Sequence, residues 1–295
     1  MPTIDNNRLE SESLVPNGAR LKPSIPVTPT ILTIAGSDTS CGAGIQADLK
    51  TIHANGGYAF TVTTALTAQN SMGVSSVNVV DSRVVQAQIE AILSDVHIDA
   101  LKIGMLGSLD IVKVVIEAIR KYNIKNIVLD TVIISSSGKR LLDIEALELF
   151  IYELIPLVDV ITPNLLEINS LTNMNFRGLD SEYEAIFYSI SKLNCKSVLI
   201  KGGHFQDIST STDILIDKNS KISKFSSKRV LTNHTHGTGC TLSSAIATYL
   251  AKGYTLIKSI EFAKKYLTNR LSNSSNLNFN YKFKIEERTE NINHY

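Results

Sequence analysis

Short apolar runs alternate with amphipathic segments along most of the chain. The apolar runs are short and rich in β-branched residues, which is typical of buried strands. One of them, TILTIAG, ends in a glycine at Gly36. The pattern predicts strands at residues 30–36, 59–68, 99–105, 126–132, 159–164, 197–203 and 212–217, the last of which pairs with 221–227 through a polar turn.

The segments between these runs carry apolar residues at helical spacing. In the segment that begins at Ser82, one helix face collects Val85, Ile89, Ile92 and Val96. The same spacing predicts helices at residues 109–122, 143–155 and 240–253. This alternation predicts an α/β fold, in which helices cover both faces of a mainly parallel sheet. Ligands of such a sheet bind beyond the carboxyl ends of its strands.

The limits of this alternation predict the domain organisation. Residues 29–272 contain no internal repeat and no low-complexity linker, so we expect one domain. Residues 1–28 are polar and rich in proline, which predicts a mostly disordered arm. Residues 273–295 are rich in asparagine and only weakly periodic, which predicts a loose polar tail.

Composition narrows the class of protein. Of the 295 residues, 43% are hydrophobic and the net charge is +1, so bulk electrostatics give no reason to expect nucleic acid or a membrane surface as partner. No stretch reaches the ~18 apolar residues of a membrane span. The arm lacks the apolar core of a secretory signal, and its acidic residues disfavour a transit peptide. Three sparse cysteines suit a reducing compartment, so we expect a cytoplasmic protein.

A glycine-rich turn follows the first predicted strand. Residues 42–47 fit a relaxed dinucleotide-binding pattern, but the next strand ends in Gln69 and Asn70 where that pattern requires an acidic residue. We therefore do not expect NAD. A turn that only packs strand against helix fits these glycines as well as a ligand-facing loop does, and the polar pair Ser37 and Asp38 favours the ligand.

An amide and a carboxylate stand three residues apart after the strand DVITP. Asn164 and Glu167 begin a predicted helix and face the same way. An ordinary helix start would use the same two residue types, asparagine as the cap and glutamate as a partner of the helix dipole. Asp130, at the end of the strand NIVLD, adds a second carboxylate at this edge. Together these oxygen donors favour Mg²⁺, held largely through water.

The stretch IKGGH again places glycines directly after a strand. Lys201 could meet a phosphate there, although a plain surface turn fits the motif as well. His53, His97 and His204 do not have the spacing of shared metal ligands, so we interpret them as structural or surface residues.

The stretch HTHGTGC leads into the helix predicted at 240–253. No GxxxxGK[ST] motif occurs in the chain, so phosphate must be bound without a P-loop. A helix N-terminus with successive backbone N–H groups can stabilise a phosphoryl group in transfer, and here it would be formed by Gly237, Thr238, Gly239 and Cys240. The alternative is a glycine-rich helix start with a small buried cysteine. The polar, flexible surroundings favour the anion site.

Seven stretches resemble, in order, those of the hydroxymethylpyrimidine/phosphomethylpyrimidine kinase family of the ribokinase-like superfamily. They are LTIAGSDTSCGAGIQADLKT, TALTAQNSMGV, KIGML, VLDTV, ITPNLLE, IKGGH and HTHGTGCTLSSAIA, and they cover roughly residues 29–270. The resemblance implies a ribokinase-like three-layer sandwich and, usually, a homodimer. It also implies ATP- and Mg²⁺-dependent phosphorylation of 4-amino-5-hydroxymethyl-2-methylpyrimidine, followed by a second phosphorylation to the diphosphate used to build thiamine.

The resemblance further implies roles for single residues. These are substrate binding for Gln69, Gly36, Asp48 and Met105, nucleotide binding for Lys201 and Thr235, metal binding for Asn164, Glu167 and Asp130, and an anion hole with a catalytic base for Gly237, Thr238, Gly239 and Cys240. Gln69 would hydrogen-bond the aminopyrimidine, and Met105 would cover its ring. We expect the helix N-terminus and nearby cations to lower the pKa of the Cys240 thiol, so that kcat rises with pH through that pKa.

The chain departs from the family at several positions. Thr39 and Cys41 replace the usual proline and glycine, and Ser136 replaces a lysine that is thought to help handle phosphate. The glycine-rich C-terminal motif of the family is missing after Ser272. We therefore expect the second phosphorylation to be the weaker activity.

Two alternative functions stay open. A related pyridoxal kinase shares the cysteine, but kinases of that type do not carry glutamine at position 69. A non-catalytic pyrimidine sensor on the same fold would be free to lose Asn164, Glu167 and Cys240, all of which are present.

Overall fold

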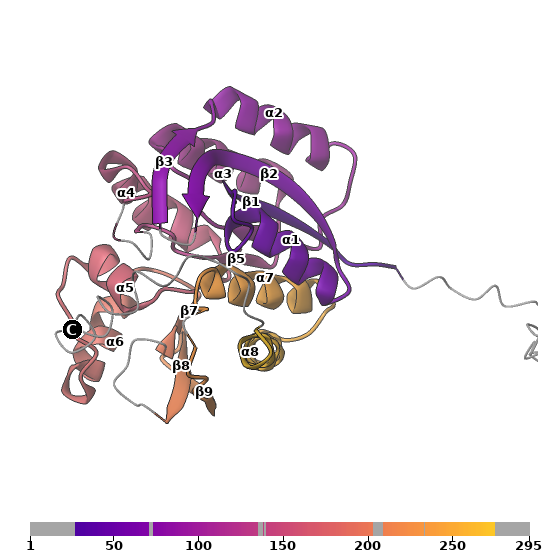
Figure 1. The fold of residues 1–295 in the computed structure, drawn as a ribbon. Coiled ribbons are helices and arrows are strands. Elements are labelled where there is room, and N and C mark those ends of the chain that lie inside the picture. The colour runs from indigo at the N-terminus through magenta and orange to yellow at the C-terminus, as the bar shows by residue number, and fades with distance from the viewer. Residues whose placement is uncertain are drawn as a thin grey trace, which may run out of the picture.

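The computed structural model describes residues 27–70, 73–134, 138, 140–202, 209–232 and 234–274 (Figure 1). The predicted arm and tail lie outside these ranges except where they join the rest of the chain. Ser136 and His204 also lie outside the described residues.

Nine strands in the described ranges form one sheet in the order β3-β2-β1-β4-β5-β6-β7-β8-β9 (Figure 1). All pairings from β2–β1 through to β6–β7 are parallel. The outer strands β3, β8 and β9 pair antiparallel. The strands are β1 Thr30–Asp38, β2 Tyr58–Asn70, β3 Gly73–Val79, β4 Ala100–Ile103, β5 Ile127–Leu129, β6 Val160–Ile161, β7 Ser197–Ile200, β8 Thr210–Asp217 and β9 Ile222–Lys228.

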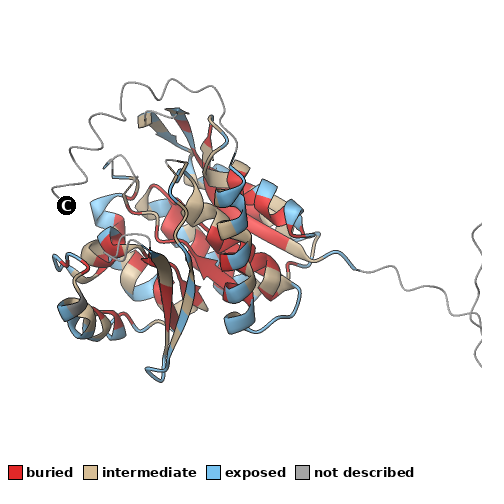
Figure 2. Ribbon diagram, turned by 60° about the horizontal axis from the view of Figure 1, so that its bottom comes forward, coloured by how far each residue is buried: buried red, intermediate tan, exposed pale blue. Residues whose placement is uncertain are grey.

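Helices cover both faces of the sheet, which gives three layers (Figures 1 and 2). One layer consists of α1 (Gly44–Ala54), α7 (Thr238–Ala251) and α8 (Leu256–Ser272). The other consists of α2 (Ser82–Leu93), α3 (Leu109–Tyr122), α4 (Ile144–Leu149), α5 (Leu165–Thr172) and α6 (Tyr183–Ser191). No helix in the described ranges is both long enough and apolar enough to cross a membrane.

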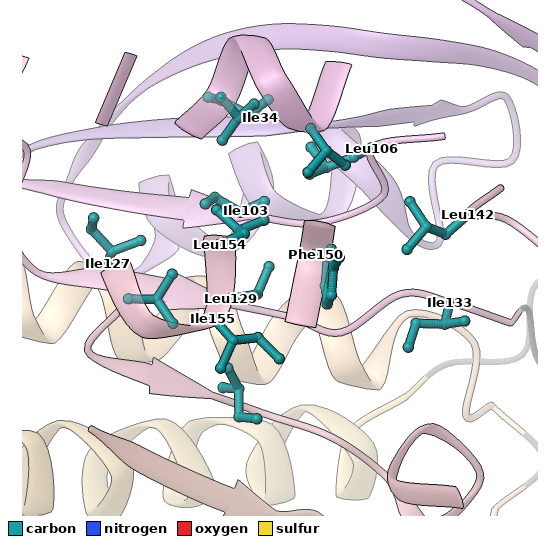
Figure 3. Close-up of a cluster of buried hydrophobic side chains, with 14 of the residues drawn as sticks. Ile34, Ile103, Leu106, Ile127, Leu129, Ile133, Leu142, Phe150, Leu154 and Ile155 are labelled. Carbon is teal, nitrogen blue, oxygen red and sulfur yellow. The ribbon is translucent and has the colours of Figure 1, made fainter. Parts of the chain in front are cut away.

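The sheet separates two hydrophobic cores. Successive residues of β5 alternate between them, because side chains on a strand point to opposite faces. Ile127 and Leu129 belong to the larger core with Phe150 (Figure 3), whereas Val128 packs with Ile246 of α7 in the smaller one. Burial on both faces explains why the central strands have continuous apolar sequences.

The predicted elements are present, with some differences in their bounds, and the helices α6 and α8 were not predicted. The predicted pairing of 212–217 with 221–227 is confirmed as the β8–β9 hairpin. The edge strand β3 was not predicted, and α2 ends at Leu93, before Val96. The helix predicted at 143–155 is α4 followed by a π-helical turn, Phe150–Leu154, and a 3₁₀ turn, Ile155–Leu157.

Candidate active site

Polar side chains collect at the edge where the parallel strands end. Asp38 ends β1, Asp130 directly follows β5, and Lys201 directly follows β7. Strand β2 ends at the same edge, close to Gln69. The first turn of α7 reaches this edge as well, because Gly239 lies next to Asp130 and Lys201.

Two glycine-rich turns meet there. One joins β1 to α1 and contains Gly42, and the other precedes α7 and contains Gly237. Gly237 has a φ of +78°, and a Cβ at this residue would overlap the carbonyl oxygen of Gly42. A side chain would therefore strain the backbone and push the turns apart. Glycine at position 237 lets the start of α7 lie directly against the β1–α1 turn.

Asp38 fixes the shape of the β1–α1 turn. Its carboxylate accepts the backbone N–H groups of Ser40 at 2.8 Å, Gly42 at 3.1 Å and Ala43 at 2.8 Å. His236 Nε2 lies 2.8 Å from Asp38 Oδ2. Burial acts to raise the pKa of this carboxyl, but the hydrogen bonds from His236, Ser40 and Ala43 hold it well below its usual range. Asp38 is therefore an ionised carboxylate whose partners belong to the chain itself.

The first turn of α7 presents unpaired N–H groups. Within the described residues, the backbone N–H groups of Gly239 and Cys240 donate to no acceptor, as is usual at a helix N-terminus. A Cβ at Gly239 would stand 3.3 Å from both Lys201 Nζ and Asp130 Oδ2. The missing side chain brings these N–H groups close to the lysine. Thr238 instead closes the preceding turn, because its N–H and hydroxyl donate to the carbonyl oxygen of the exposed Thr235 at 3.3 Å and 2.9 Å.

The three predicted metal-binding residues lie together around Lys201. Its Nζ stands 3.0 Å from Asp130 Oδ1 and 3.5 Å from Glu167 Oε2. Glu167 Oε2 also accepts the Thr131 hydroxyl at 3.0 Å and the backbone N–H of Asn164 at 2.8 Å. Asn164 Oδ1 accepts the N–H of Glu167 at 2.9 Å, which completes a capping box at the start of α5. The ordinary helix start therefore exists, and it also holds the Glu167 carboxylate beside the lysine.

Two buried carboxylates share this one lysine. Burial acts to raise the pKa of Asp130, but the charges of Lys201 and Lys102 lower it overall. The pKa of Glu167 is raised, mainly by burial and further by Asp130, although Lys201 opposes the rise. Glu167 therefore carries the less compensated negative charge. A second cation at this point would stabilise it.

Asp48 has partners within the protein itself, and the substrate-binding role that the resemblance implied for it stays a prediction. Asp48 and Lys102 are both completely buried, and Lys102 Nζ lies 2.8 Å from Asp48 Oδ2. The hydroxyls of Ser244 and Thr33 donate to the same carboxylate, each at 2.7 Å. Both carboxylate oxygens therefore have protein partners. The network joins α1 to β1, β4 and α7 beneath the site.

The thiol of Cys240 is not activated in this structure, so the expected lowering of its pKa is wrong. Burial raises the pKa of this thiol to about 12. The charge of Lys102 and a hydrogen bond from the backbone of Gly44 act in the opposite direction and do not compensate. Loss of solvent thus outweighs the helix N-terminus. Near neutral pH, residue 240 carries a neutral thiol.

The other predicted substrate-side residues come from adjacent strands. Gly36 lies on β1, Met105 follows β4, and Gln69 lies near the end of β2. A Cβ at Gly36 would stand 3.1 Å from Met105 Sδ, so the absence of a side chain lets the thioether lie over the strand. The amide nitrogen of Gln69 stands 3.0 Å from His236 Nε2. Gln69 is therefore linked to the turn that leads into α7.

Sequence reasoning missed two functional neighbours. His236 lies within the stretch HTHGTGC, but only its glycines, its cysteine and its threonines were singled out. Lys102, in a predicted strand, is a charged residue inside an apolar run, and that pattern was a signal for a buried ion pair. The partners of both residues lie far away in sequence.

Cavities alone would not have located this site. One cavity of about 520 Å³ lies at the opposite, amino edge of the sheet, lined by Asp99 and Asn126 among others. A smaller one of about 200 Å³ borders His236 and Thr238, next to the paired turns. We place the site at the carboxyl edge of the sheet, where the charged residues and the free N–H groups converge, because neither cavity is lined by Asp130, Glu167 or Lys201.

The sequence match agrees with this geometry, since residues 38–284 fit the family described as phosphomethylpyrimidine kinase. The chain belongs to the phosphomethylpyrimidine kinase family. The hydroxymethylpyrimidine/phosphomethylpyrimidine kinase of Salmonella typhimurium is 43% identical over 246 residues, which are 83% of this chain and 92% of that enzyme. By contrast, the chain spans 45% of the probable thiamine biosynthetic bifunctional enzyme of rice, to which it is 39% identical over 249 residues.

Solved structures confirm the ribokinase-like fold of this family member. The phosphomethylpyrimidine kinase of Clostridium difficile 630 matches with a TM-score of 0.71 and 42% identity, over 82% of this chain and 99% of that chain. An ADP complex of Bacillus subtilis pyridoxal kinase matches with a TM-score of 0.77 and 33% identity, over 85% and 95%. The TM-score is higher for the pyridoxal kinase, whereas the sequence identity is higher for the phosphomethylpyrimidine kinase. The backbone comparison alone therefore does not distinguish the two kinases, whereas the family match and the curated relatives are those of pyrimidine kinases.

Proposed function

We propose that the protein transfers the γ-phosphoryl group of ATP to the hydroxymethyl group of 4-amino-5-hydroxymethyl-2-methylpyrimidine, and then phosphorylates the monophosphate to the diphosphate for thiamine synthesis. The observation that carries this proposal is the convergence of Gln69 and the free N–H groups of Gly239 and Cys240 on one edge of the sheet. Gln69 supplies the donor and acceptor that an aminopyrimidine needs. The N–H groups supply a site for the phosphoryl group.

The residues at the start of α7 would stabilise the phosphoryl group in transfer. Its oxygens would accept hydrogen bonds from the N–H groups of Gly239 and Cys240. The positive charge of Lys201, which lies beside these groups, would stabilise the oxygens further. Thr235, exposed in the turn before α7, would contact the nucleotide. The transition state of phosphoryl transfer is loose, so positioning and charge stabilisation contribute most of the rate. Cys240, in its thiolate form, would receive the proton of the substrate hydroxyl as that bond forms and become the neutral thiol.

The residues around Lys201 fit Mg²⁺. Within the described residues, no three His, Cys, Asp or Glu side chains are grouped so that they could hold a metal by themselves. Mg²⁺ does not need such a cage, since it binds through one or two carboxylates, water and substrate phosphates. Asp130 and Glu167 would supply those carboxylates, and the only partly compensated charge of Glu167 favours a cation. Once bound, Mg²⁺ would neutralise phosphate charge.

Gln69 distinguishes this function from that of a pyridoxal kinase, so its replacement is an informative test. Gln69→Met should raise KM for the pyrimidine about tenfold or more, because a buried polar pairing contributes on the order of 1–3 kcal/mol when one partner is lost. KM for ATP should not change. Steady-state kinetics measure both constants, with Gln86→Met, an exposed glutamine on α2, as the matched control. Unchanged pyrimidine kinetics would rule out this role.

Ser136 should limit the second phosphorylation. That step holds a substrate phosphate beside ATP, and serine supplies no positive charge where the family has lysine. We expect a lower kcat/KM for the monophosphate than for the alcohol, and a gain for the monophosphate in Ser136→Lys. Ser191→Lys, which adds the same charge at an exposed position on α6, serves as control. Equal kcat/KM values for the two steps, with no gain in the variant, would contradict this explanation.

The non-catalytic alternative makes a different prediction. A pyrimidine sensor would show a thermal shift with the pyrimidine but release no ADP when ATP and Mg²⁺ are added. The two buried carboxylates and Lys201 favour the enzyme, because binding a neutral pyrimidine does not require them. The sparse cysteines also support a cytoplasmic protein. From the family resemblance we propose a homodimer, which sedimentation of the purified protein would test.

A further inference from the structure

Asp38, His236 and Gln69 form a continuous chain of polar contacts between the two turns and β2. His236 Nε2 lies 2.8 Å from Asp38 Oδ2 and 3.0 Å from the amide nitrogen of Gln69. The Asp38 side chain is 3% exposed and that of His236 is 34% exposed. A Cβ at Gly42 would overlap the imidazole ring, so the ring lies directly on the β1–α1 turn. These contacts fix the position of the His236 ring.

The proton on His236 Nε2 is committed to Asp38. The carboxylate can only accept, and it already accepts two backbone N–H groups through the same oxygen, Oδ2. The 2.8 Å contact therefore requires a hydrogen on Nε2. A nitrogen that carries this hydrogen has no lone pair for a second donor. The NH₂ group of Gln69 therefore cannot hydrogen-bond to His236, whereas its carbonyl oxygen can share the Nε2 hydrogen.

Thr67 restricts the other end of the amide in the same way. Its hydroxyl donates to the carbonyl oxygen of Ser37 at 2.8 Å and lies 3.3 Å from Gln69 Oε1, while the amide nitrogen faces His236. Because its hydrogen is used, Thr67 Oγ1 can only accept from Gln69. The NH₂ group of Gln69 can donate to Thr67 Oγ1, whereas the carbonyl oxygen of Gln69 would find no hydrogen there to accept. Both neighbours thus select the other amide orientation, in which oxygen faces His236 and nitrogen faces Thr67.

We propose that His236 is a positioning residue that fixes the amide orientation of Gln69 and thereby selects a 4-aminopyrimidine over a 4-oxopyrimidine. This inference rests on the proposed function. A 4-aminopyrimidine presents an N–H donor at C4 and an acceptor at N3, whereas the 4-oxo analogue presents an acceptor at C4 and a donor at N3. With its oxygen on the His236 side, Gln69 complements the amino compound and opposes the oxo compound.

The fixed amide also orients the ring for transfer. The 4-amino group would pair with the Gln69 oxygen, on the side of His236. The hydroxymethyl group is attached to the ring carbon next to the one that bears the amino group. It would therefore also lie on the His236 side of the ring, farther from Gln69 than the amino group does. Residues 237–240, which carry the free N–H groups, directly follow His236 in the chain. A ring bound the other way round would point its hydroxyl away from them.

The test is the ratio of kcat/KM for the 4-amino compound to kcat/KM for its 4-oxo analogue. His236→Leu should lower this ratio about tenfold or more, because the amide can then rotate to suit either ring. His236→Gln, which keeps an N–H donor near the same place, should retain most of the ratio. Thr67→Val removes the acceptor at the other end of the amide without touching Asp38, and it should also lower the ratio. His53→Leu, an exposed histidine on α1, is the matched control.

A merely structural role would lower activity with both pyrimidines equally and leave the ratio unchanged. That result in both His236→Leu and Thr67→Val, each folded by circular dichroism, would overturn the proposal. The proposed function fails separately, if the wild-type protein phosphorylates neither pyrimidine. A lowered ratio in both variants, with retention in His236→Gln and His53→Leu, supports the assignment.

Discussion

Replacing Cys240 with alanine is expected to lower kcat about 10²-fold or more and to leave KM for both substrates near the wild-type values. The substrate hydroxyl loses its proton during transfer, and the residue beside the free N–H groups of α7 is the nearest acceptor in our assignment. Binding of the ring and of ATP depends on other residues, so KM should be spared. Cys195→Ala, the same change at a partly buried cysteine next to β7, is the control.

The pH dependence should follow from the raised pKa of this thiol. At a pKa of about 12, only about one molecule in 10⁴ carries a thiolate at pH 8. Because the minor thiolate is the base in our assignment, the wild-type kcat should rise about tenfold per pH unit between about pH 6 and 9, without a plateau. Cys240→Asp, which supplies an acceptor that is already ionised, should recover part of the activity lost in Cys240→Ala. Full activity of Cys240→Ala would reduce residue 240 to a packing role.

Lys102→Met is expected to destabilise the folded protein by about 3–5 kcal/mol, because it leaves a buried carboxylate without its cation. Asp48 would keep only the hydroxyls of Ser244 and Thr33 as partners. Urea unfolding followed by circular dichroism measures the free energy of unfolding. Lys113→Met, which removes an exposed ion pair with Asp110 on α3, should change it far less.

A double variant separates the charge from the packing. Lys102→Met with Asp48→Leu removes both charges and should regain much of the lost stability, since apolar pairs often replace buried ion pairs without loss. A single Lys102→Met variant as stable as the wild type would show that the pairing of Lys102 with Asp48 does not stabilise the fold.

The strands and layers were readable from the sequence because they depend on local pattern. The central strands are buried on both faces, so their apolar runs stand out, and β8 and β9 are joined by a polar turn. Strand β3 has no buried residue, and a half-exposed edge strand gives no apolar run to detect. The π-helical turn at Phe150–Leu154 keeps a nearly helical pattern, so sequence periodicity does not reveal it.

The site was readable in its parts but not in its electrostatics. The glycines before α7, Glu167 and Lys201 stand at the ends of predicted elements, so topology alone places them at one edge. Burial and partners come from the tertiary structure. The local rule for a helix N-terminus gave the wrong direction for Cys240, because burial outweighs it. Asp48 lies on α1, close to the glycine-rich turn, where a carboxylate suggests a ligand contact. Its pairing with Lys102 becomes visible only in the tertiary structure.

The most direct test of the function is a competition between the two candidate alcohols. The wild-type protein is incubated with ATP, Mg²⁺ and equal concentrations of 4-amino-5-hydroxymethyl-2-methylpyrimidine and pyridoxal, and the phosphorylated products are quantified over time by mass spectrometry. We predict that the pyrimidine monophosphate forms first, that the diphosphate follows more slowly, and that pyridoxal phosphate is a minor product. Pyridoxal phosphate as the main product, or no phosphorylated pyrimidine at all, would contradict the account.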